Sequence, residues 1–169
     1  SINNLIGYKK KYAKEKVFLE KKIKELGEKK YKVSIARCFT FIGKDITQYN
    51  YAISDLINDA NNMTKITLKS SIDVFRSYMH SDDLSNWLIT ILENSNTKCP
   101  IYNVGSDRAV NLKNLTKKIA KIANKKISIR TNKSTNFDYY VPSITKGHKE
   151  LNLKISINLN DALNSIIKT

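Results

Sequence analysis

Residues 33–43 read Val-Ser-Ile-Ala-Arg-Cys-Phe-Thr-Phe-Ile-Gly, a short apolar run that ends at a glycine. A run of this kind fits a parallel strand that is buried on both faces. A second such run occupies residues 100–104, and segments with helical periodicity stand before, between and after the two. Strands that alternate with helices indicate α/β packing. The sequence therefore predicts an α/β fold.

The first predicted helix runs from about residue 10 to Gly27, which is expected to form its C-cap. Tyr12 and Lys16 lie one turn apart on it and head a mostly apolar stripe. The stripe consists of Tyr12, Lys16, Leu19, Ile23 and Leu26. Lys16 is thus the lysine that the helix turns towards its apolar side. An alternative is that Lys16 merely extends from the edge of a buried face.

The spacing of the two residues has a chemical logic. A free phenol has a pKa near 10, which is too high for a general base at neutral pH. An ammonium about 4 Å away contributes roughly 4 kcal/mol at an effective dielectric constant near 20. That energy equals roughly three pKa units and would bring a phenol to about 7, where proton transfer is most efficient. Tyr12 and Lys16 are therefore candidates for acid–base chemistry.

Further elements follow from periodicity and capping residues. Helices are expected over residues 53–60, after Asp82 and Asp83, after Asn111, over residues 145–151 and from about residue 158. Strand-like runs occupy residues 65–69 and 127–130, whereas residues 132–143 are expected to form a polar and aromatic loop.

Length and composition favour an ordinary globular protein. The chain has 169 residues, of which 41% are hydrophobic, and this is enough for a real core. We find no run long enough for a membrane span and no signal-peptide pattern, so the cytoplasm is expected. Cys38 and Cys99 lack the spacing of metal ligands. Cys38 lies in an apolar run and is expected to be a buried, reduced thiol.

The net charge of +15 raises the question of nucleic acid binding. Only four of the 30 basic residues are arginines, and the lysines are spread from end to end. This distribution indicates a compositional bias rather than a recognition surface. Nucleic acid is therefore not the expected partner, although the charge would help to attract an anionic substrate. A basic interaction or nucleic-acid-binding module remains the alternative function.

The glycines are too dispersed to form a phosphate-binding turn. A dinucleotide fold uses a glycine-rich turn after its first strand, whereas the five glycines here are widely separated. The sequence alone therefore does not support independent binding of a dinucleotide cofactor.

Four stretches taken in order resemble one known family. They are Tyr-Ala-Lys-Glu-Lys at 12–16, Ala-Arg-Cys-Phe-Thr-Phe-Ile-Gly at 36–43, Arg-Ser-Tyr-Met-His-Ser-Asp-Asp-Leu at 76–84 and Ile-Tyr-Asn-Val-Gly-Ser-Asp at 101–107. Their order and spacing resemble the carboxyl-terminal half of the extended short-chain dehydrogenases/reductases, in the NAD-dependent nucleotide-sugar epimerase/dehydratase family. The resemblance implies the second half of a doubly wound Rossmann-type domain plus a small α/β substrate-binding subdomain.

The resemblance also implies which segments of the chain form the Rossmann sheet and which bind substrate. Residues 1–49 and parts of 70–110 would complete the Rossmann sheet, whereas about 50–70 and 111–169 would mainly bind substrate.

Roles for individual residues follow from the same resemblance. Tyr12 would transfer the proton of a sugar hydroxyl, and Lys16 would also bind the nicotinamide ribose. The cofactor-binding residues would be Tyr12, Lys16 and Phe39, and the substrate-binding residues Thr40, Arg76, Lys133 and Tyr140. Thr40 stands where the family usually has Asn, and Ser77 where it usually has Asp. Arg76 would grip the diphosphate, because a guanidinium fork fits phosphate oxygens.

The activity implied is that of an NAD- or NADP-dependent enzyme acting on a nucleotide diphosphate sugar, in the synthesis of surface-polysaccharide sugars. The cofactor would require an amino-terminal half that this chain does not contain. Whether the reaction is an epimerisation, dehydration, decarboxylation or reduction is left open. A homodimer through helices that include the Tyr12/Lys16 helix is also implied, and no metal or membrane is expected.

Overall fold

The computed structural model describes residues 8–44, 51–129 and 136–168. Its helices are α1 (Tyr8–Glu28), α2 (Ala52–Asn62), α3 (Ser81–Glu93), α4 (Leu112–Ile122), α5 (Thr145–Leu151) and α6 (Leu159–Ile166). Its strands are β1 (Ile35–Cys38), β2 (Phe41–Ile42), β3 (Lys65–Leu68), β4 (Asp73–Arg76), β5 (Met79–His80), β6 (Ile101–Val104), β7 (Val110–Asn111), β8 (Lys126–Ile129) and β9 (Phe137–Tyr140). Strands and helices alternate along most of the chain, as expected.

The chain forms two compact units. The first contains Ser1–Arg37 and Leu88–Tyr102, and the second contains Cys38–Trp87 and Asn103–Thr169. We describe each unit by itself.

In the first unit, the end of α1 differs from the prediction. The backbone N–H of Tyr31 donates to the carbonyl of Leu26 at 3.1 Å, and that of Lys30 donates to Gly27 at 2.9 Å. This bonding pattern closes a helix with a left-handed residue, and that residue is Lys30 at φ 69°. The prediction that Gly27 is the C-cap was therefore wrong, because the helix continues past it.

Gly27 has a packing role instead. A Cβ atom at this position would lie 2.5 Å from the carbonyl oxygen of Thr97. Only a residue without a side chain allows the helix and this backbone to approach so closely.

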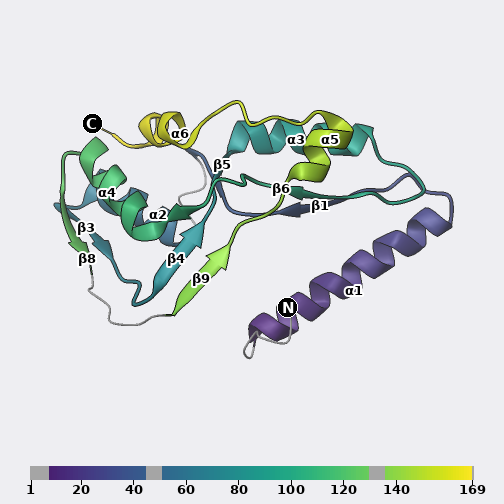
Figure 1. The fold of residues 1–169 in the computed structure, drawn as a ribbon, viewed down its shortest axis with the longest axis horizontal. Helices are drawn as coiled ribbons and strands as arrows, with labels where there is room; N and C mark the ends of the chain where they lie inside the picture. Colours follow the sequence, from purple (N-terminus) through teal and green to yellow (C-terminus); the bar gives the residue numbers. More distant parts are fainter. Residues whose placement is uncertain (1–7, 45–50, 130–135, 169) are drawn as a thin grey trace. The chain divides into compact units, whose positions relative to one another are not determined.

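The core of the second unit lies between α2, α4, α6 and the parallel pair β3–β8 (Figure 1). Ile66 and Leu68 of β3 are buried and alternate with exposed or half-buried residues. Leu115 and Ile119, one helical turn apart on α4, are fully buried in the same core. Asn111 caps α4 by accepting a hydrogen bond from the backbone N–H of Lys113 at 2.9 Å, as its position predicted.

A three-stranded sheet of the second unit has the order β7-β4-β9. β4 pairs with β7 in the antiparallel direction and with β9 in the parallel direction. Residues 137–140 were predicted to lie in a loop, and that prediction was wrong. Their backbone pairs with a strand distant in the sequence, so the local polarity of the segment gave no signal of the pairing.

The thiols also depart from the prediction in part. Cys38 and Cys99 are not joined by a disulfide, and Cys99 is buried, but Cys38 is exposed. Cys38 is the last residue of β1, in which only Ile35 is buried. An apolar run therefore predicted the strand correctly and the burial of its end wrongly.

Candidate functional site

Tyr12 and Lys16 lie one turn apart on α1, as the sequence predicted. Lys16 Nζ lies 5.3 Å from the centroid of the Tyr12 ring, within the range of a cation–π contact. Both side chains are exposed. The phenol and the ammonium are thus close neighbours on an open surface, where they are accessible to a ligand.

The stripe that these residues head is largely uncovered in the structure. Tyr12 is 59% exposed, Leu19 50% and Leu26 42%. Helical periodicity correctly predicted that these residues share one side of the helix, but it does not show what covers them. Val17 and Phe18 are also exposed, so α1 presents more apolar surface than a solvated helix normally does.

Arg76 is the last residue of β4, in the second unit. Its Nη2 donates to Oδ2 of Asp138 at 2.6 Å, and its Nη1 donates to the carbonyl oxygens of Phe75 at 2.8 Å and Asp138 at 3.3 Å. These bonds fix the plane of the guanidinium group. The side chain is 24% exposed, so one part of the group still faces solvent.

Two aromatic rings complete this cluster. Phe39 and Tyr140 stack with their centroids 4.7 Å apart and an interplanar angle of 28°. Arg76 Cζ lies 5.8 Å from the centroid of the Tyr140 ring. Three predicted site residues that are far apart in the sequence are therefore adjacent in the structure. We call Phe39, Arg76, Asp138 and Tyr140 the arginine cluster.

Thr40 and Lys133 are the two other residues that were predicted to bind substrate. The backbone carbonyl of Thr40 accepts a hydrogen bond from Met79 N at 3.2 Å, and its half-buried side chain directly follows Phe39. Lys133 lies outside the described residues.

Asp138 is a member of the cluster that the sequence analysis missed. Asp138 and Tyr140 are two residues apart on β9 and therefore lie on one face of the sheet. The parallel register places Arg76 opposite Tyr140, on that face. The juxtaposition depends on the pairing of β9 with β4 and on its register, which the sequence around residues 137–140 does not predict.

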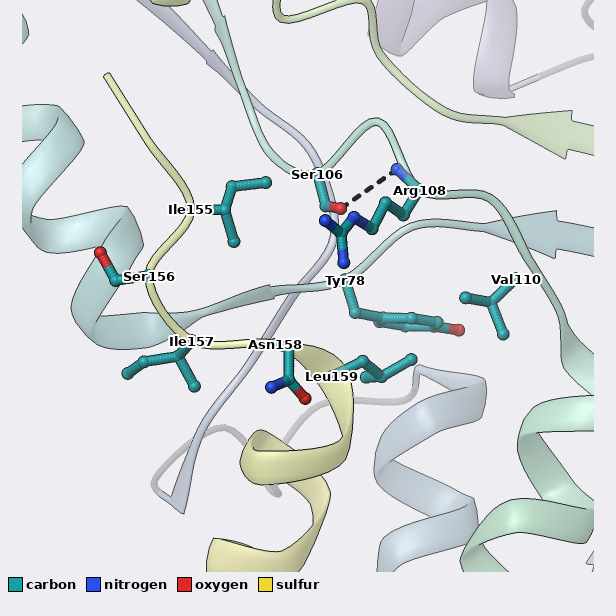
Figure 2. Close-up of a pocket in the computed structure, with 9 residues that line it drawn as sticks. All are labelled: Tyr78, Ser106, Arg108, Val110, Ile155, Ser156, Ile157, Asn158 and Leu159. Atoms are coloured by element: carbon teal, nitrogen blue, oxygen red, sulfur yellow. Dashed lines mark hydrogen bonds between the residues drawn. The ribbon is translucent and has the colours of Figure 1, made fainter. Parts of the chain in front are cut away.

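A cavity of about 120 Å³ lies elsewhere in the second unit (Figure 2). Figure 2 shows the ring of Tyr78 between Arg108 and Leu159. The backbone N–H of Arg108 donates a hydrogen bond to Ser106 Oγ at 3.2 Å. Burial raises the pKa of Tyr78 to about 12, although Arg76 opposes the shift. Tyr78 therefore stays protonated at neutral pH, and none of the predicted site residues lines this cavity.

Asp83 has a structural role. It is 2% exposed and lies in the first turn of α3. Its carboxylate accepts from the backbone N–H of Ser156 at 3.0 and 3.2 Å and from that of Ile157 at 2.9 Å. Trp87 Nε1, one turn further along, donates to the carbonyl of Lys154 at 2.9 Å. Together the two side chains attach residues 154–157 to α3.

The fit of the described residues to a dinucleotide can be tested at the glycines. Gly105 approaches Phe39 and Pro142, and Gly147 packs against Leu153 and Trp87. These contacts join side chains within the protein rather than cradle a phosphate. Tyr12 and Lys16 could meet one end of a nicotinamide nucleotide, but none of the glycines described here forms a pyrophosphate-binding turn.

Within the described ranges, no three His, Cys, Asp or Glu side chains are grouped so that they could hold a metal ion. The helices of the same ranges include none that is both long enough and apolar enough to cross a membrane.

The sequence matches the model of the NAD dependent epimerase/dehydratase family over residues 3–105. The chain belongs to this family. No curated protein sequence matches it. The predicted relationship to this family is thus confirmed.

Solved structures place this family member in a known fold. It is similar to RMD from Pseudomonas aeruginosa complexed with NADPH, with a TM-score of 0.80 and 21% identity, over 92% of this chain and 54% of that one. It is also similar to UDP-glucose 4-epimerase from Thermotoga maritima with UDP-glucose, with a TM-score of 0.73 and 17% identity, over 94% of this chain and 50% of that one. A third similar structure is dTDP-glucose 4,6-dehydratase from Bacillus anthracis in complex with NAD. Its TM-score is 0.65 and its identity 17%, over 80% of this chain and 43% of that one.

The predicted α/β fold, the second half of a doubly wound Rossmann-type domain, is confirmed by these similarities. The family member spans about half the length of the solved structures that it matches.

Proposed function

We propose that this chain supplies the proton-transfer pair and the substrate-binding arginine of an NAD- or NADP-dependent nucleotide-sugar epimerase/dehydratase. The observation that carries the proposal is the position of Lys16 Nζ, 5.3 Å from the centroid of the Tyr12 ring on an exposed side of α1. In this reading Tyr12 exchanges a proton with a sugar hydroxyl. Lys16 favours the phenolate and binds the ribose of the nicotinamide, which exchanges a hydride when it is bound.

The environment of the pair determines when it can act. At any given separation, two unit charges interact about four times more strongly at an effective dielectric constant near 20 than in water. Covering the exposed side of α1 would exclude water and strengthen the effect of Lys16 on Tyr12. We therefore propose that the pair becomes active only when another protein segment covers this side.

The covering segment would be the dinucleotide-binding half of the family fold. The exposed apolar side chains along α1 support this proposal, and so does the dispersion of the glycines in the described residues. Alone, the chain is expected to bind NAD and NADP very weakly, a result that titration calorimetry can test. A homodimer through α1 is a further way to cover the same apolar surface.

The arginine cluster would bind the diphosphate and the nucleoside of the substrate. A guanidinium group donates two parallel hydrogen bonds to phosphoryl oxygens, and an aromatic ring such as Tyr140 offers a flat face to a base or a ribose. Phe39 would lie between cofactor and substrate, with Thr40 beside it. Residues 1–49 and parts of 70–110 would complete the sheet, and the remaining residues would mainly bind substrate. The products would be sugars for surface polysaccharides.

The experiment is a comparison of three variants in an active enzyme that contains this chain and a dinucleotide-binding half. Tyr12→Phe keeps the ring and removes the hydroxyl, so turnover should fall by about 10²–10⁴-fold while substrate affinity is nearly unchanged. Lys16→Met should also lower turnover and shift the pH profile of kcat. Tyr31→Phe is the matched control, because Tyr31 is 62% exposed in the turn just after α1. Equal turnover of Tyr12→Phe and Tyr31→Phe would refute the catalytic assignment.

A further inference from the structure

We propose that Asp138 sets the anion affinity of Arg76, because an incoming phosphate must displace its carboxylate from the guanidinium group. The inference rests on the proposed function of Arg76 as the substrate-binding arginine and adds a residue that determines how tightly, and for which anions, that site binds.

The ion pair occupies the position that a ligand oxygen would need. Oδ2 of Asp138 lies 2.6 Å from Nη2 of Arg76. A carboxylate and a phosphoryl group use the same donors of a guanidinium fork, with the same planar geometry. A diphosphate that binds Nη2 of Arg76 would therefore compete with Asp138 for that group.

Exchange of the two anions would leave Arg76 in place. Nη1 of Arg76 donates to the carbonyl oxygens of Phe75 and Asp138, and neither contact involves the Asp138 side chain. The centroid of the Tyr140 ring lies 5.8 Å from Cζ of Arg76, and this contact does not involve the carboxylate either. Arg76 is thus held by contacts that survive when the carboxylate moves away.

The carboxylate itself is free to move. Its side chain is 43% exposed, and ion pairs with that degree of exposure contribute little to stability. Asp138 can therefore be displaced, at the cost of its ion pair with Arg76, and the carboxylate then remains near the bound phosphate and repels it. Removing its charge should raise the affinity for a multivalent anion by about tenfold, which combines the lost competition and the lost repulsion.

The neighbouring strand, which carries Arg76, provides a matched control. Asp73 begins β4, its carboxylate lies 2.8 Å from Lys113 Nζ, and its side chain is also 43% exposed. Neutralising Asp73 removes the same charge from the same sheet without touching the arginine cluster. The comparison of Asp138→Asn with Asp73→Asn therefore separates a local effect on Arg76 from a general effect of net charge.

The experiment measures the dissociation constant of inorganic pyrophosphate for the full 169-residue chain by isothermal calorimetry or by NMR titration of arginine side chains. Asp138→Asn should bind about tenfold more tightly than wild type. Asp73→Asn should stay within about twofold of wild type. Arg76→Met should abolish the gain when it is combined with Asp138→Asn. Asp138→Ser serves as a second neutral variant if Asp138→Asn does not fold.

The outcomes distinguish this inference from the function on which it rests. If wild type binds pyrophosphate through Arg76, but neither neutral variant of Asp138 binds it more tightly, the inference fails and the role of Arg76 stands. A weaker affinity of both neutral variants would also overturn it and would assign Asp138 to the positioning of Arg76. If neither the wild type nor any Asp138 variant binds, the inference and the proposed anion site fail together.

Discussion

Replacing Asp83 by alanine should lower the free energy of unfolding by about 2–4 kcal/mol. The carboxylate is 2% exposed and accepts bonds from two backbone N–H groups, those of Ser156 and Ile157. An N–H left without a partner costs about 1–3 kcal/mol, so the two N–H groups together cost about 2–6 kcal/mol. Partial exposure of residues 156 and 157 lets water replace part of the loss, so the lower half of the summed range applies.

The assay is urea unfolding followed by the fluorescence of Trp87, the single tryptophan of the chain. Trp87 binds the same segment through Lys154, so its emission reports the attachment directly. Asp82→Ala is the control, because the carboxylate of Asp82 is 72% exposed. This substitution should change the free energy of unfolding by less than about 0.5 kcal/mol. Equal losses in the two variants would refute the reasoning and would leave the attachment of residues 154–157 to Trp87 alone.

Three further predictions concern other contacts. Gly27→Ala should destabilise the protein by about 1–2 kcal/mol in thermal unfolding, since crowding against Thr97 outweighs the gain in helix propensity. Arg37 holds the pKa of Glu20 below its usual value, chiefly through a hydrogen bond. The lowered pKa means that this contribution is present above the unfolded pKa near 4.5 and is lost as the pH falls through the folded value, so wild type and Glu20→Gln should converge in acid unfolding curves. Ser77→Ala should leave the melting temperature unchanged or higher, because the buried Oγ has no hydrogen-bond partner among the described residues.

The helices could be predicted from the sequence because each carries its own signals. Asn111 caps a helix in the structure, as its position predicted, and Asn158 caps the helix that was expected to begin near it. The end of α1 was harder to predict from the sequence, because Lys30 adopts a left-handed conformation that a glycine would favour. Lysine gives no local sign of that conformation.

The arginine cluster was only half predictable. Arg76 and Tyr140 were recognised through a resemblance, whereas Asp138 depends on the pairing of β9 with β4. Long-range pairing leaves no trace in the few residues around a position. The exposure of Tyr12 was unpredictable for a related reason, because periodicity indicates which residues share a side of a helix but not whether that side is covered.

The pairing of β4 with β9 makes the arginine cluster sensitive to the spacing of the chain. Side chains alternate between the two faces of a strand, so a shift of one residue moves every one of them to the opposite face. A single-residue insertion or deletion between Asn136 and Asp138 could bring Tyr139 to the face of Arg76 and turn Asp138 and Tyr140 away. All four side chains of the cluster would still be present in such a sequence. Length variation in this segment can therefore abolish an anion site, or create one, without any substitution in the residues that form it.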